Sequence, residues 1–198
     1  SGQPRAKKNE AGSYSDIANR LKNQNDYKQA LQYYLKGIDI LEKAGLDAEL
    51  VTVYCNVSTL FGDILEPAKQ NEYAKKAVAA AINTGQDQKQ VMAYIILANS
   101  YTMQDDNLSA KKSMDSAGKH FNELILINNV EILFSYYLVL GQVFKNLDQL
   151  DSAFNSFQKC FEISKKYNYS YGKAESQLQI GAVAIMLKKY KEAETYLL

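Results

Sequence analysis

Apolar residues recur along the chain at spacings of three and four, the period of an amphipathic α-helix. The clearest run is residues 137–160, in which large and small side chains hold fixed positions on two consecutive helical faces. The first face carries Tyr137, Leu140, Gly141 and Phe144, and the second carries Ala153, Phe157 and Cys160. We therefore predict two helices here, joined by a short turn.

The same arrangement occurs in four other places, and a central small residue marks each copy. These residues are Ala18, Ser58, Ala98, Gly141 and Gly181, spaced by 40, 40, 43 and 40 residues. Such self-similarity is typical of solenoids, in which each pair of helices leaves an apolar face that only the next pair covers. The small residue allows two helices to pack closely where they cross.

Residues typical of helix ends fall between the predicted helices. Asp26 and Asp106 stand where the second helix of a copy should begin, as N-caps. Pro67 stands at a first helical turn, where proline is tolerated. Gly45 and Gly85, again 40 residues apart, stand where second helices should end.

This pattern resembles the tetratricopeptide repeat (TPR), whose motif is aromatic-x2-Leu-Gly/Ala-x2-Tyr, followed by x8-Ala-x3-Phe/Tyr-x2-Ala. Residues 137–160 follow it, with Cys160 in place of the last Ala. The other departures are a weak second helix in copy two, and Gln177 and Ala184 where aromatic residues are usual. The resemblance covers about residues 12–198 and implies an all-α, right-handed α-solenoid of about five helix-turn-helix repeats. The period near 40, against the common 34, implies longer helices.

The predicted repeats span roughly residues 12–45, 47–85, 87–121, 128–167 and 170–198. Residues 1–11, which begin with Ser-Gly instead of Met, are interpreted as a tag scar or linker. The last repeat ends within a helix. Because a solenoid needs a polar cap, we expect the native protein to continue.

Composition excludes several classes of function. The 23 basic and 22 acidic residues give a net charge of +1, which argues against a dedicated nucleic-acid or anionic-membrane surface. No apolar run reaches the roughly 18 residues of a membrane span. Two cysteines form neither a disulfide framework nor a zinc site. The compartment stays open, with a cytoplasmic location favoured over the periplasmic one that would follow removal of a signal peptide.

Candidate chemistry is sparse, and we expect no enzyme activity, cofactor or metal. The single histidine, His120, cannot build a metal cluster or a catalytic triad alone. Residues 118–119 and 172–173 are Gly-Lys pairs that lack the remaining residues of a phosphate loop. Cys55 has no cationic neighbour in sequence that would activate its thiol, so a packing role is favoured. Lysine pairs such as 75–76 are interpreted as a solvated outer face.

The TPR resemblance implies that the first helix of each repeat lines a concave groove. The polar groove positions are Asn19, Asn56, Asn99 and Gln142, whose amides could pair with the backbone of an extended peptide. The apolar groove positions are Met92, Ile95, Ile96, Leu138, Val139 and Leu178, which would form a floor for side chains of the peptide. Alternatively, a later helix of a longer protein fills the groove.

The resemblance also argues against one known mode of TPR binding. Some TPR domains hold a C-terminal carboxylate through a Lys/Asn/Arg clamp, but Met92 and Ile96 stand at its basic positions in the third repeat.

Three functions remain in competition. The leading interpretation is a non-enzymatic scaffold that binds a protein or peptide partner in the groove, with no nucleic acid and no membrane span. The alternative is a ligand-sensing arm of a larger bacterial transcription regulator or sensor kinase, in which ligand shifts the curvature of the solenoid. An enzyme is disfavoured by the sparse chemistry. The sequence identifies neither the partner nor the oligomeric state.

Overall fold

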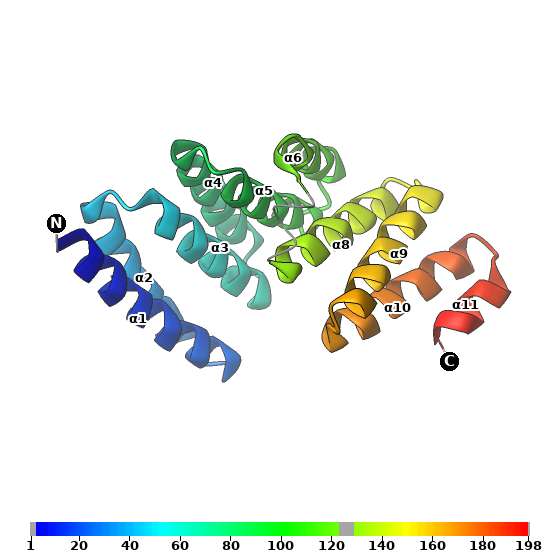
Figure 1. Ribbon diagram of the computed structural model, residues 1–198, viewed down its shortest axis with the longest axis horizontal. Coiled ribbons are helices and arrows are strands. Elements are labelled where there is room, and N and C mark those ends of the chain that lie inside the picture. The colour runs from blue at the N-terminus through cyan, green and yellow to red at the C-terminus, as the bar shows by residue number, and fades with distance from the viewer. Residues whose placement is uncertain (1–2, 123–128, 198) are drawn as a thin grey trace.

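The computed structural model describes residues 3–122 and 129–197, and every element in them is helical (Figure 1). The described helices are α1 (Gln3–Asn23), α2 (Tyr27–Ala44), α3 (Asp47–Asp63), α4 (Pro67–Thr84), α5 (Asp87–Thr102), α6 (Asn107–His120), α8 (Val130–Asn146), α9 (Leu150–Lys166), α10 (Ser170–Met186) and α11 (Tyr190–Leu197). They pack in consecutive pairs, α1 with α2 through α10 with α11. The predicted all-α solenoid of about five repeats is confirmed.

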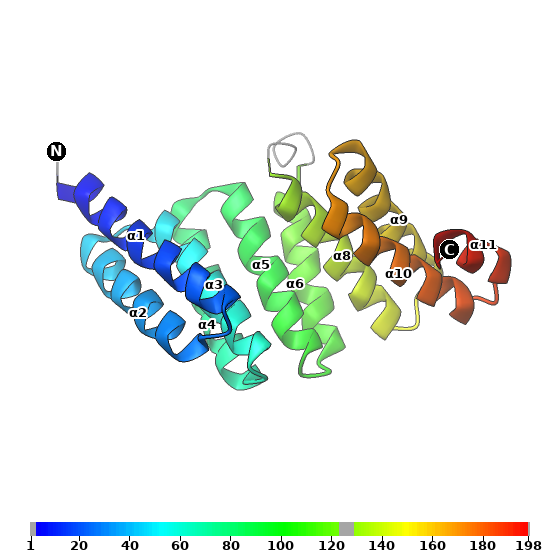
Figure 2. The same cartoon turned by 90° about the horizontal axis from the view of Figure 1, so that it is seen from below.

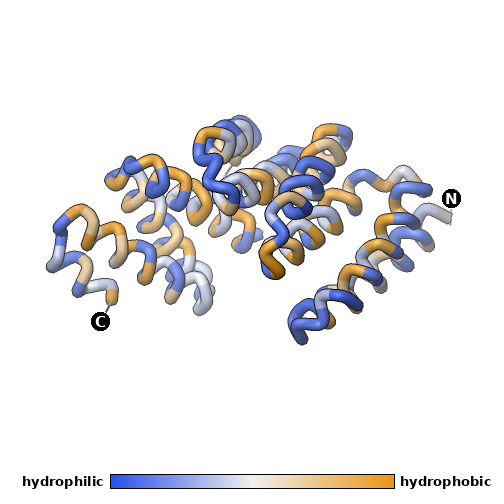
Figure 3. The backbone as a smooth tube through the Cα atoms, turned by 180° about the vertical axis from the view of Figure 1, so that it is seen from behind, coloured by the Kyte–Doolittle hydropathy of each residue, from blue (hydrophilic) through white to orange (hydrophobic). Residues whose placement is uncertain are grey.

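The pairs stack into an arch with the two chain ends at its two feet and α6 on its outer side (Figure 1). Each second helix contacts the first helix of the next repeat, as α2 contacts α3 and α4 contacts α5. The first helices also contact one another, in the order α1, α3, α5, α8 and α10. The first helices therefore form the inner layer, and hydrophobic and hydrophilic residues alternate along the helices (Figure 3).

The helix ends confirm the predicted caps. The carboxylates of Asp26 and Asp106 accept hydrogen bonds from the backbone N–H groups of Gln29 and Ser109, each at 3.1 Å. Pro67 is the first residue of α4. Gly45 and Gly85 follow α2 and α4 in the left-handed conformation, both with φ of 63°.

The turn inside each repeat contains a residue with positive φ, which the sequence analysis did not predict. These residues are Asn25, Leu65, Asp105, Asp148 and Lys188, spaced by the same 40, 40, 43 and 40 residues as the central small residues. Each turn is closed by a long-range backbone bond, such as Asp26 N–H to Leu21 C=O and Glu66 N–H to Phe61 C=O, both at 2.9 Å. This is the Schellman geometry, which needs a left-handed residue.

The central small residues lie at close helix crossings, as predicted. A Cβ added to Gly141 would lie 2.6 Å from the Phe157 ring, and one added to Gly181 would lie 2.5 Å from Leu197. Ala18 and Ala98 are completely buried at the equivalent positions. A larger side chain would push each pair of helices apart.

The second repeat packs by a different solution. Gln70 occupies the position of the conserved-size alanine in the motif and is buried, and Gly62 leaves the space for it, because a Cβ there would lie 2.9 Å from Gln70 Nε2. The Ser58 hydroxyl donates to the Gln70 backbone oxygen at 2.8 Å. The weak motif in this repeat is therefore a repacked helix pair with a polar side chain inside it.

Helix α1 begins at Gln3 instead of residue 12, so most of the segment interpreted as a tag scar or linker is helical. Pro4 lies in the first turn, where its missing N–H costs no helical hydrogen bond. Ala11 is buried, and its backbone oxygen lies 3.4 Å from the Cβ position of Gly37 on α2. Packing against α2 thus orders a segment whose own composition is mostly polar.

Candidate binding groove

The inner surface of the arch is formed by α1, α3, α5, α8 and α10, which follow one another from one end to the other in Figure 2. All predicted groove residues lie on these five helices. None of the helices in the described part of the chain is long and apolar enough to cross a membrane.

A cleft of about 540 Å³ opens between α1, α3 and the start of α5. It is lined by Lys8, Ala11, Gly12, Ser15, Asp16 and Asn19 of α1, by Leu41 of α2, by Ala48, Glu49, Thr52, Val53 and Asn56 of α3, and by Gln86 and Lys89 beside and within α5. Two of the four predicted amides, Asn19 and Asn56, are therefore brought together in one concavity.

These two amides are already linked inside the protein. The Asn19 Oδ1 atom accepts hydrogen bonds from the hydroxyl of Tyr34 at 2.5 Å and from Asn56 Nδ2 at 3.4 Å. The amides of Asn99 and Gln142 are half-buried and make no side-chain hydrogen bond to another described residue. The four amides are thus not equivalent, and Asn99 and Gln142 keep the most capacity to bind a ligand.

The charged side chains of the cleft lie on three different helices. Lys8 forms an ion pair with Glu49. Lys89 Nζ donates a hydrogen bond to the Thr52 hydroxyl at 2.8 Å. Burial lowers the pKa of Lys89, because taking an ammonium group out of water disfavours its charged form.

Sequence reasoning missed these cleft residues, Lys8, Glu49, Thr52 and Lys89. They belong to three repeats and do not share a motif position, and Lys8 falls in the segment interpreted as a linker. The only signal was the helical phase: Thr52 and Asn56 lie four residues apart on the inner face of α3.

Two of the predicted apolar groove residues are not at the surface. Ile95 is 3% exposed and Val139 is 6% exposed, because α5 and α8 pack side by side and bury both side chains in one core cluster. Neither is available to a ligand in this conformation. Met92, Ile96 and Leu138 are partly buried.

Leu178 is the one predicted apolar position that is mainly exposed, at 57%. Ile185, one turn and three residues further along α10, is also largely exposed. The apolar part of the groove is therefore smaller than predicted and lies toward α10, away from the cleft.

Both cysteines are buried and have no partner cysteine. Burial raises the pKa of Cys55 to about 12, and the nearby Lys89 opposes this only in part. This cation comes from the next repeat and is invisible in the local sequence. Burial also raises the pKa of Cys160, whose Sγ lies 3.6 Å from the Phe134 backbone oxygen. Both thiols are protonated at neutral pH and act as packing groups.

His120 lies at the end of α6, where its Nδ1 atom is 2.8 Å from Asp87 Oδ1. Its ring stacks on Tyr94 with a centroid distance of 6.4 Å. Across residues 3–122 and 129–197, no three side chains of His, Cys, Asp or Glu come together as metal ligands would.

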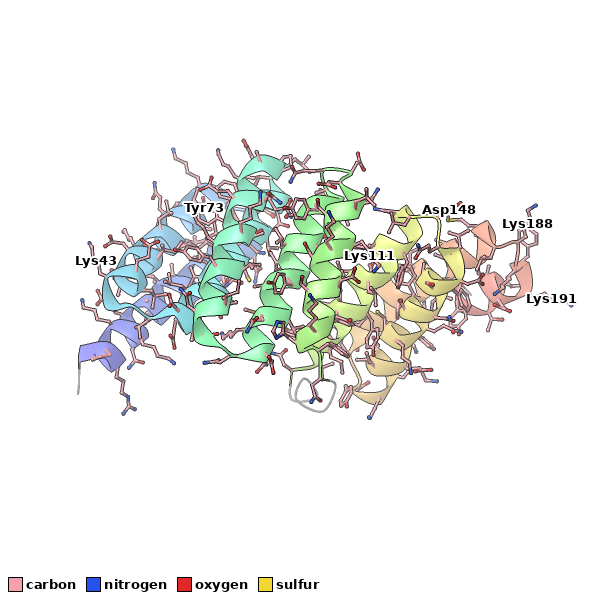
Figure 4. All side chains as sticks on the ribbon, turned by 90° about the horizontal axis from the view of Figure 1, so that it is seen from above. Lys43, Tyr73, Lys111, Asp148, Lys188 and Lys191 are labelled. Atoms are coloured by element: carbon pink, nitrogen blue, oxygen red, sulfur yellow. The ribbon has the colours of Figure 1, made fainter. Side chains whose placement is uncertain are left out.

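The outer surface carries lysines, seen in the view from above as Lys43, Lys111 and Lys191 (Figure 4). Lys43 pairs with Asp39, and Lys76 lies over the ring of Tyr73 at 4.6 Å. These lysines lie on the face opposite the groove, in agreement with a solvated outer layer.

Comparison with known proteins supports the repeat assignment. Models of the tetratricopeptide repeat match residues 11–44 and residues 134–167, which form the first and fourth helix pairs. No curated protein matches the sequence.

Several solved structures share the fold at low sequence identity. BtubC (BKLC) from P. vanneervenii has a TM-score of 0.80 and 16% identity over 98% of this chain and 79% of that chain. A MamA protein has a TM-score of 0.58 and 23% identity over 94% of this chain and 87% of that chain. A Rap protein complexed with Competence and Sporulation Factor has a TM-score of 0.77 and 16% identity. That match covers 94% of this chain but 52% of the Rap protein, about half its length.

Proposed function

Because the chain is a tetratricopeptide repeat protein, a class that commonly mediates protein interactions, we propose that it is a non-enzymatic scaffold that holds an extended peptide along its inner surface. The observation that carries the proposal is the continuity of that surface. A polar cleft between α1, α3 and α5 is followed by the unengaged amides of Asn99 and Gln142, and then by Leu178.

The chemistry of these groups suits an extended backbone. A peptide presents N–H and C=O groups at regular intervals, and a side-chain amide offers both a donor and an acceptor. Each such bond contributes about 1 kcal/mol net, so affinity depends on several of them acting together. Exposed Leu178 would add a contact for an apolar side chain.

The test is a selection of random peptides displayed on phage against the folded chain, followed by calorimetry with the best peptide. We expect the double variant N99A/Q142A to weaken its binding by at least about tenfold, since two hydrogen bonds are lost. The matched control K43A/K191A changes two exposed side chains of the outer surface and should bind as the wild type does. Equal affinity of all three proteins would overturn the groove as the binding site.

A second candidate is the ligand-sensing arm of a larger regulator. It is favoured by the similarity to the Rap protein that was crystallised with a factor, since this chain aligns with about half of that protein. Small-angle X-ray scattering with and without the selected peptide separates the two, because only a sensing arm requires a change of curvature.

A further inference from the structure

Lys89 has an environment that a purely structural lysine seldom has. It is half-buried at the start of α5, and its side chain lines the cleft. Its Nζ atom donates to Thr52 Oγ1, but no carboxylate of the described residues lies within ion-pair distance of it. An ammonium group has three N–H donors, so a single hydroxyl leaves most of its hydrogen-bonding capacity unused.

The other charges of the cleft do not neutralise this cation. Glu49 is engaged with Lys8 by an ion pair, and it reaches Lys89 only as a longer-range attraction. Asp16 is exposed on α1 and forms no ion pair with a described residue. Partial burial of a cation without a paired anion costs free energy, and a ligand anion that binds beside it recovers part of this cost.

The far part of the groove sets a second condition on the ligand. On α10, Leu178 and Ile185 expose 57% and 49% of their surface on successive turns. The inner surface is therefore polar and cationic near α5 and apolar near α10. A ligand that complements both parts carries an anionic group at one place and apolar side chains at another.

We propose that the cleft between α1, α3 and α5 is a subsite for a carboxylate of the bound peptide, which forms a charge-assisted hydrogen bond with Lys89. The subsite rests on the proposed peptide-binding function and adds the chemistry of the ligand: an acidic residue or a free C-terminus, with apolar residues toward α10. The carboxylate contacts Lys89 on α5, and the Thr52 hydroxyl orients the ammonium group.

The experiment uses ten-residue random peptides coupled to beads through their N-termini, prepared once with a free C-terminal carboxylate and once amidated. Fluorescent wild-type protein is expected to select peptides with an Asp or Glu at a preferred position, or to lose most hits on amidation. The first result assigns a side-chain carboxylate and the second a C-terminal one. The variant K89M should bind the same peptides at least tenfold more weakly, and K89R should recover much of the affinity.

Two controls keep the outcome interpretable. K43M removes a lysine from the outer surface and should select the same peptides as the wild type. Circular dichroism of K89M, and a T52V variant that removes only the hydroxyl, separate loss of the subsite from loss of the fold. Hits without acidic preference and insensitive to amidation would overturn the subsite while leaving the groove intact. No hits at all with folded wild-type protein would overturn both.

Discussion

At the scale of single residues, space explains most of what the motif requires. The central position of each repeat is small because a neighbouring side chain occupies the volume beside it, as Phe157 does for Gly141. Sequence reasoning reached this from spacing alone. It did not find the pair of Gly62 and Gln70, because the two residues compensate for each other and each looks like a departure from the motif.

Replacement of Gly141 by alanine tests the close crossing. Alanine in a helix gains about 1 kcal/mol over glycine, but overpacking in a filled core costs about 1–3 kcal/mol. Because Phe157 is completely buried and cannot move aside, we expect G141A to lower the stability toward urea. G12A is the matched control, since nothing lies within 4 Å of its added Cβ, and it should gain about 0.5–1 kcal/mol. Equal gains in both variants would contradict the role of Phe157.

At the scale of helices and turns, the repeat is marked as strongly by its backbone as by its side chains. Five turns inside repeats carry a left-handed residue at the repeat spacing. Asn25, Asp105 and Asp148 tolerate this conformation, whereas Leu65 and Lys188 do not favour it. The sequence predicted the helices on either side but not these turns, because their geometry is imposed by the packing of the two helices.

Leu65 offers a direct test of the turn geometry. It has a φ of 57° and is 76% exposed, so its side chain contributes little packing against the left-handed strain. We expect L65N to raise the free energy of unfolding by about 0.5–1 kcal/mol, because asparagine adopts this conformation more readily. L65A keeps the strain and should change little. A similar gain in L65A would instead assign the effect to removal of an exposed apolar group.

At the scale of the whole molecule, the core extends along the full length of the arch and buries several groups that ionise at alkaline pH. Burial raises the pKa of Cys55 from its ordinary value of 9.0 to about 12, and burial followed by the charge of Asp63 raises that of Tyr34 from 10.0 to about 12. Both groups are neutral when protonated. In this range the unfolded chain loses these protons while the native protein keeps them.

The free energy of unfolding should therefore be constant below about pH 8 and should fall above about pH 9, by up to roughly 1.4 kcal/mol per pH unit for each such group. Urea titrations at a series of pH values measure this slope. C55A removes one of the groups and should show a smaller decrease than the wild type between about pH 9 and pH 11. The same slope in both proteins would show that Cys55 ionises without unfolding.

The sequence by itself determined the all-α solenoid, the five helix pairs, the caps at Asp26 and Asp106 and the small residues at the crossings. These features depend on interactions within one repeat, which recur at a fixed spacing and are therefore visible as a pattern. Tertiary structure alone decided which groove positions are open. Ile95 and Val139 are buried because α5 packs on α8, and Lys89 reaches Thr52 and Cys55 from the next repeat. Such contacts join residues 34 to 44 positions apart, and no local spacing records them because the register between successive repeats is set by how their surfaces fit together.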